Sequence, residues 1–172
     1  AAGPAARQGD WVLGLGWDQN DWPSKDFPTR WSLDELERTP AFLTRVDGHA
    51  AWVNGEALKR AKITKDTKDP PGGRIVRDKV GEPTGVLIDN AMDLVASKIP
   101  PPSEDQVKLR LKSALELCAR LGLTGIHDAG EDLRTFEQLQ RWDAGGKLPI
   151  RIYAMAKGQA DDRDLFLGRG PF

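Results

Sequence analysis

Residues that form covalent or metal cross-links are scarce in this chain. Its 172 residues include one cysteine, Cys118, which excludes an internal disulfide framework and a cysteine zinc cluster. There are two histidines, His49 and His127, and they stand in separate motifs. Two imidazoles are too few for a self-contained histidine-rich metal site. If the chemistry of this protein needs a first-row metal, most of the ligands must come from outside the chain.

Long apolar runs and an excess of one charge are also missing. No segment approaches the ~18 consecutive apolar residues of a membrane span, and Ala1–Arg7 lacks the basic and apolar regions of a signal peptide. Lys plus Arg number 25 against 26 Asp plus Glu, so the formal net charge is −1. This balance gives no electrostatic reason to expect nucleic acid or an anionic membrane as a partner. We expect a cytoplasmic protein.

The two ends of the chain carry no terminating signal. Position 1 is not methionine, and the last residues, Leu167–Phe172, have the composition of a loop. We therefore expect this sequence to be a piece of a longer protein.

The pattern of the second half predicts alternating helices and strands. Ser103 begins a capping box, and the apolar residues after it are spaced as one stripe along a helix. A strand is expected over Leu123–Asp128, followed by a helix that ends at Gly145-Gly146 and a strand over Leu148–Met155. Such alternation is typical of parallel βα units, as in a doubly wound sheet or a (β/α)8 barrel. Two strands alone cannot close a barrel.

The first half alternates less regularly, and its pattern predicts a separate α+β layer. Ser32 has the spacing of a capping box that starts a short helix, and Asn54 is expected to cap another. The triple proline at 100–102 separates two predicted domains, 1–102 and 103–172. Strands are predicted in four places: 11–16, 42–46, 75–77 and 84–88, the last two as a hairpin.

One candidate site lies at the end of the strand predicted over Leu123–Asp128. In βα architectures, polar residues at the C-terminal end of a strand face the mouth of the active site. His127 and Asp128 stand there, where either could orient a ligand or act as an acid or base. The alternative is that Asp128 binds loop amides and His127 is a satisfied interior residue.

A second candidate site is the segment Arg45–Asn54. It places an arginine, a carboxylate, an imidazole, an indole and an amide around a glycine turn. Such groups orient a polar substrate inside a largely apolar pocket, and the candidates are His49, Trp52 and Asn54. The alternative is a strand-to-helix turn with Asn54 as the cap and Trp52 in the core. The tryptophans crowded into the first 52 residues could likewise line a pocket or simply provide packing.

Four segments in this order resemble the amidohydrolase superfamily of metal-dependent hydrolases, in the group that includes N-substituted formamide deformylase. They are Leu15–Asp18, Arg45–Asn54, Pro83–Leu87 and Gly122–Gly130. The resemblance implies a TIM-barrel enzyme that splits carbon–nitrogen bonds other than peptide bonds with metal-activated water. It also implies the fold class: α/β, with a partial TIM barrel in the second half and an inserted α+β region in the first.

The same resemblance implies that the metal ligands are absent from this chain, which corresponds to about a third of a full-length member. The family's His-x-His pair should precede it, and its carboxylated lysine, two later histidines and catalytic aspartate should follow Phe172. We expect no catalytic or metal-binding residue here, and a divalent metal, zinc, only in the intact parent. Five residues are expected to contact the substrate or to support residues that do: His49, Trp52, Asn54, His127 and Asp128.

The leading hypothesis is therefore a fragment of a metal-dependent amidohydrolase that is inactive alone. Its expected partners are a small amide-type substrate, the remainder of the parent chain and, as an option, a second copy in a homo-oligomer. Nucleic acid and membrane are not expected. The alternative hypotheses are a small-ligand-binding module that uses the tryptophan-rich half, and a structural module that docks onto a complementary chain.

Overall fold

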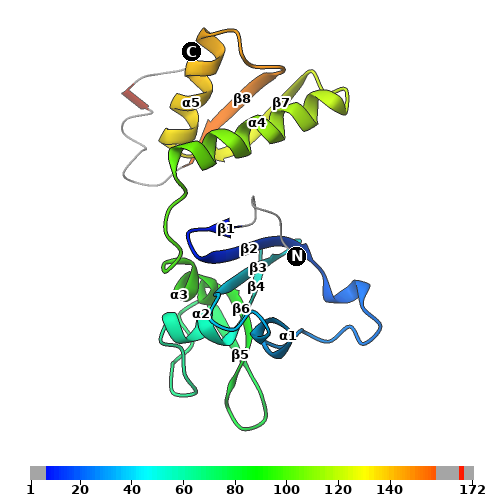
Figure 1. Cartoon of the computed structure of the whole chain (residues 1–172), viewed down its shortest axis with the longest axis vertical. Helices are drawn as coiled ribbons and strands as arrows, with labels where there is room; N and C mark the ends of the chain where they lie inside the picture. Colours follow the sequence, from blue (N-terminus) through cyan, green and yellow to red (C-terminus); the bar gives the residue numbers. More distant parts are fainter. Residues whose placement is uncertain (1–6, 158–166, 169–172) are drawn as a thin grey trace. The chain divides into compact units, whose positions relative to one another are not determined.

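The computed structural model describes residues 7–157 and 167–168 (Figure 1). The chain divides into two compact units, an N-terminal unit, Ala1–Pro101, and a C-terminal unit, Pro102–Phe172. Most of the loop expected at Leu167–Phe172 lies outside the described residues, and the two that are described, Leu167 and Gly168, have helical backbone. Within the described residues, no helix is both long enough and apolar enough to cross a membrane.

The N-terminal unit is built on a six-stranded sheet with the order β1-β2-β3-β4-β6-β5. The pair β2–β3 is parallel, and every other neighbouring pair is antiparallel. The predicted hairpin is confirmed, because β5 pairs with β6. The strands are β1 (Arg7–Gln8), β2 (Trp11–Trp17), β3 (Ala41–Arg45), β4 (Ala50–Val53), β5 (Gly73–Arg77) and β6 (Pro83–Asp89).

The core of the N-terminal unit lies between this sheet and two short helices. The helices are α2 (Gly55–Arg60) and α3 (Asp93–Ala96), which a 3-10 helix, Asn90–Met92, precedes. Leu58 of α2 and Val95 of α3 pack in one cluster with strand residues that include Phe42, Val53 and Leu87. Burial of such apolar side chains is the main driving force for folding of this layer.

Two helix starts were predicted in the N-terminal unit, and the structure confirms one of them. Asn54 caps α2 as predicted, with its side chain accepting a hydrogen bond from the Ala57 amide. The capping box predicted at Ser32 is wrong: α1 (Trp31–Asp34) begins after Arg30, two residues before the predicted cap, and has no side-chain cap. The Arg30 amide donates to the Thr84 carbonyl of β6, so a tertiary contact fixes where this helix begins.

The C-terminal unit contains α4 (Glu104–Arg120), β7 (Gly125–Glu131), α5 (Leu133–Ala144) and β8 (Arg151–Ala156). The capping box at Ser103 is confirmed, and β7 pairs with β8 in parallel, as the alternating pattern predicted. Side chains from both helices and from the strands form one core around Leu115, Leu139 and Ile150. The chain is therefore a mixed α/β protein.

Candidate functional site

His49 lies on the exposed turn between β3 and β4, and three hydrogen bonds hold it there. Its amide donates to Asp47 Oδ1 at 3.0 Å, and its carbonyl accepts from the Asp89 amide at 3.0 Å. Its ring atom Nδ1 lies 2.8 Å from Asp89 Oδ1. The side chain is nevertheless 71% exposed. The turn therefore fixes the imidazole while leaving most of it open to solvent.

An arginine–carboxylate pair stiffens the same turn. Arg45 Nε donates to Asp47 Oδ1 at 2.8 Å, and a second bond joins its terminal NH2 to the other carboxylate oxygen. This bidentate contact, with the His49 amide, holds the pKa of the Asp47 carboxyl well below its usual range. Asp47 therefore stays ionised in solutions acidic enough to protonate an ordinary aspartate.

Trp52 belongs to a cluster of three indoles, Trp17, Trp22 and Trp52. Trp17 and Trp22 stack with ring centroids 6.1 Å apart, and Trp52 meets both edge-on at 6.3 and 6.1 Å. Two of the indole N–H groups are bound to backbone, that of Trp17 to the Leu43 carbonyl and that of Trp52 to the Thr29 carbonyl. All three rings are half-buried, so the cluster offers a rigid aromatic surface and also packs within the unit.

Asn54 is fully buried, and its side chain makes its hydrogen bonds to backbone groups. Oδ1 accepts from the amides of Ala57 and Ala41, both at 3.0 Å, and Nδ2 donates to the Thr39 carbonyl at 2.8 Å. This is the structural role weighed as the alternative for Asn54. The amide has no polar atom exposed to a ligand, so direct substrate contact by Asn54 has no support in this geometry.

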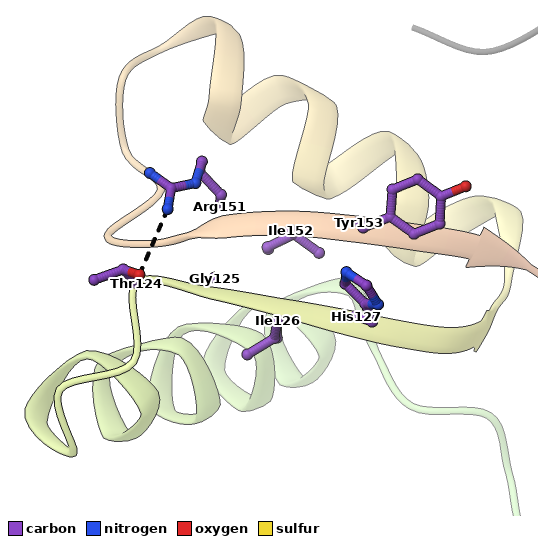
Figure 2. A pocket seen from close by; sticks show the side chains of 7 residues that line it. All are labelled: Thr124, Gly125, Ile126, His127, Arg151, Ile152 and Tyr153. Atoms are coloured by element: carbon purple, nitrogen blue, oxygen red, sulfur yellow. Dashed lines mark hydrogen bonds between the residues drawn. The ribbon is translucent and has the colours of Figure 1, made fainter.

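His127 lies on the face of the β7–β8 pair that the helical core does not cover. We call this the open face and define it by His127, Tyr153 and Met155. Its Cα partner in the ladder is Tyr153, and the two rings lie 5.2 Å apart and tilted by 49°. Figure 2 shows the two rings side by side on the two strands, where they line a pocket. At the other end of this pocket, Arg151 donates to the Thr124 hydroxyl. This pocket has a volume of about 630 Å³. His127 is exposed in this unit.

Asp128 points to the opposite face of β7 and pairs with a carboxyl that the sequence did not single out. Its ladder partner is Ala154, which packs on the helical core. Burial, and then the hydrogen bond and charge of Asp128, raise the pKa of Glu131 to about 7. The predicted strand end was also wrong, because β7 continues to Glu131 and places His127 inside the strand. Glu131 is thus the titratable group at the actual C-terminal end of the strand.

The described residues do not offer a ligand set for a metal ion. In residues 7–157 and 167–168, no three His, Cys, Asp or Glu side chains come together in a way that could hold one. His49 and Asp89 form a pair, and so do Asp128 and Glu131. Two protein ligands are fewer than the three that catalytic zinc sites use.

The structure thus groups the predicted residues by unit and adds partners to them. His49, Trp52 and Asn54 lie in the N-terminal unit, and His127 and Asp128 in the C-terminal unit. Asp89, Tyr153 and Glu131 were not found from the sequence. Asp89 lies 40 residues from His49, and Tyr153 lies on a different strand from His127, so only the pairing of strands reveals them.

Among solved structures, the chain resembles two described as uncharacterized metal-dependent hydrolases. It aligns with the one from Pyrococcus horikoshii OT3 with a TM-score of 0.58 and 21% identity, over 88% of this chain and 29% of that one. The one from Pyrococcus furiosus gives a TM-score of 0.56 and 22% identity. The fold of this chain is therefore one that metal-dependent hydrolases contain.

Sequence comparison defines the family. The chain belongs to the amidohydrolase family, whose model matches residues 1–168. It is 40% identical over 162 residues to the putative amidohydrolase YtcJ of Bacillus subtilis, and 33% identical over 155 residues to N-substituted formamide deformylase of Arthrobacter pascens. These matches cover 90% and 87% of this chain but 30% and 29% of the two relatives. The resemblance expected from the four sequence segments is confirmed.

Proposed function

We propose that this chain is a segment of a metal-dependent amidohydrolase that hydrolyses carbon–nitrogen bonds other than peptide bonds. The proposal includes zinc as the metal, a small amide-type substrate and the cytoplasm as the compartment. The metal ligands would come from the remainder of the parent chain, so the chain by itself is inactive. Its family membership and its match to under a third of each relative support this proposal.

The observation that carries the proposal is the one-sided covering of β7 and β8. The core around Leu115, Leu139 and Ile150 covers one face of the pair, whereas Tyr153 is 64% and Met155 39% exposed on the other. Parallel strands are found almost only with both faces covered, and in a TIM barrel the second face is the packed interior. A partial barrel that further βα units of the parent complete would account for the exposed face.

In this proposal the five predicted residues take two kinds of role. His49, Trp52 and His127 present a ring to solvent and contact the substrate. Asn54 and Asp128 act without touching the substrate. Asn54 joins β3 to α2, and Asp128 pairs with Glu131 at the end of β7. Their effect on the substrate is therefore through the position of neighbouring groups.

Metal analysis of the purified chain and of the parent protein tests the proposal. We expect the parent to carry stoichiometric divalent metal and to hydrolyse N-substituted formamides, and the chain alone to do neither. The coding sequence upstream should contain a His-x-His pair. Stoichiometric zinc bound by the chain alone, or a parent without His-x-His, would overturn the proposal.

His127→Ala in the parent tests whether the open face of β7 meets the substrate. We expect turnover to fall by about tenfold, since removing one hydrogen bond to the substrate in a closed site costs roughly 1–2 kcal/mol. If His127 lines the substrate pocket of the completed fold, the melting temperature should stay unchanged, because truncating a pocket side chain removes no packing contact of the core. Unchanged turnover with a lowered melting temperature would instead assign His127 to packing inside the completed fold.

A further inference from the structure

The pair formed by His49 and Asp89 has a geometry that the family relationship does not explain. Nδ1 of His49 lies 2.8 Å from Asp89 Oδ1, and the backbones of the two residues are also hydrogen-bonded. A carboxylate accepts and cannot donate, so the neutral imidazole must carry its proton on Nδ1. Nε2 is then the nitrogen with the free lone pair. No partner for Nε2 is found among residues 7–157 and 167–168.

The backbone of Asp89 has a conformation that residues other than glycine rarely adopt. Asp89 has φ 48° and ψ −125°, a conformation close to the first central position of a type II′ turn, which glycine strongly favours. A residue other than glycine at positive φ is strained. Strained backbone of this kind persists only where the surrounding structure over-determines it, and it is frequent in functional sites.

We propose that Asp89 is a positioning residue that fixes the tautomer and direction of His49, and that His49 Nε2 accepts a hydrogen bond from the N–H of a secondary amide. The ligand part of this inference rests on the proposed function. The geometry favours such a role because the imidazole is held by Asp89, on a turn that Asp47 fixes through the His49 amide. The side chain is 71% exposed, which leaves Nε2 toward solvent.

Imidazole ¹⁵N spectra of the chain test the positioning role without any enzyme assay. His127→Gln leaves His49 as the only histidine and so assigns its signals. In the neutral form we expect the Nδ1–H tautomer to dominate. Asp89→Gly should relieve the strained backbone and switch the dominant tautomer to Nε2–H, whereas Asp89→Asn, which keeps an acceptor oxygen, should retain part of the Nδ1–H population. A tautomer ratio that is the same in all three would overturn the inference.

Two small amides test the ligand part. N-methylformamide carries an N–H, and N,N-dimethylformamide does not. We expect the first to shift the Nε2 resonance of His49 in the wild-type chain, and the second to leave it unchanged. The shift should disappear in Asp89→Gly. Equal shifts with both amides, or none with either, would overturn the ligand assignment, while the tautomer result stands even if the parent proves not to be a hydrolase.

Discussion

At the scale of single residues, Asn54 shows how a polar side chain in a conspicuous motif can belong wholly to the fold. Its amide ties together four backbone groups, the N–H of Ala41 and of Ala57 and the carbonyls of Thr39 and Leu33. The side chain thereby satisfies groups at the start of β3 and at the first turn of α2. Buried backbone groups that lose such a partner are costly.

Asn54→Ala is therefore expected to lower the free energy of unfolding by about 2–4 kcal/mol, because it removes a helix cap and leaves buried backbone groups unpaired. Urea unfolding followed by tryptophan fluorescence measures this, since Trp142 is the only tryptophan outside the N-terminal unit. Asn20→Ala is the control. Asn20 is exposed, and among residues 7–157 and 167–168 its side chain bonds only to Asp18, so about 0.5 kcal/mol or less is expected. Equal losses of stability in both variants would contradict the structural role.

The raised pKa of Glu131 predicts that the stability of the C-terminal unit depends on pH. Its pKa is raised to about 7 in the folded chain, against an ordinary value of 4.5. The folded state therefore binds the proton more tightly than the unfolded state. The stability that this proton contributes is complete below about pH 4.5 and is lost as the pH rises through about 7.

Carboxyl ¹³C shifts recorded against pH measure this directly, with an expected midpoint for Glu131 of about 7. In Asp128→Asn the midpoint should fall, because the neighbouring negative charge is removed. Glu131→Gln should flatten the fall in unfolding free energy between pH 4.5 and pH 7. A wild-type midpoint near 4.5 would show that the carboxyl pair does not form.

At the scale of elements, β6 contains a glycine for which no other residue can substitute. Gly85 has φ +99°, and a Cβ atom there would lie 2.5 Å from the Val53 carbonyl oxygen and 2.8 Å from Arg30 Cβ. Gly81, on the turn before β6, has φ +89°, but a Cβ atom added there would have no atom within 4 Å. Both glycines therefore have a positive φ, but only Gly85 has neighbouring atoms in the space that a side chain would need.

Gly81→Ala should therefore cost about 1–2 kcal/mol of unfolding free energy for the strained backbone alone. Gly85→Ala should cost at least about 2 kcal/mol more, because β4 and the start of α1 must also move apart. Thermal or urea unfolding of the two variants gives the difference. Similar costs for the two would mean that β6 can shift away from Val53 with little strain.

The elements that the sequence predicts well are those whose signals are local. The capping box at Ser103, the cap at Asn54 and the β5–β6 hairpin each involve residues close in the chain, and each is confirmed. Ser32 fails because a contact with Thr84 moves the helix start. The parallel pairing of β2 with β3 also depends on residues far apart, so periodicity does not reveal it.

The candidate sites follow the same rule. His49, Trp52 and His127 can be proposed from the sequence because their residue types stand out within short motifs. Their partners Asp89 and Tyr153 come from other strands, and strand pairing alone brings them near. Side-chain direction was equally hidden: His127 and Asp128 are adjacent in sequence, yet they lie on opposite faces of β7.

At the scale of the whole molecule, the open face of β7–β8 and the unpaired edges of this two-stranded sheet predict self-association of the isolated chain. Exposed strand edges and apolar patches pair readily with other copies. Sedimentation velocity should show a mass that rises with concentration. Tyr153→Asp with Met155→Asp should reduce this, whereas Leu15→Asp, at an 80% exposed position of the N-terminal unit, should not. A monomer at all concentrations would contradict the prediction.

The connection between the parallel strands β2 and β3 offers a practical use. It is fastened at two points, where Trp22 stacks on Trp17 and where the Thr29 carbonyl accepts from the Trp52 indole. Between these two points, Pro23–Asp26 are exposed, and Phe27 and Pro28 are half-buried. An epitope tag or fluorophore inserted after Ser24 would be tethered at both ends to a rigid sheet, so it would report on the aromatic surface beside it without disturbing either strand.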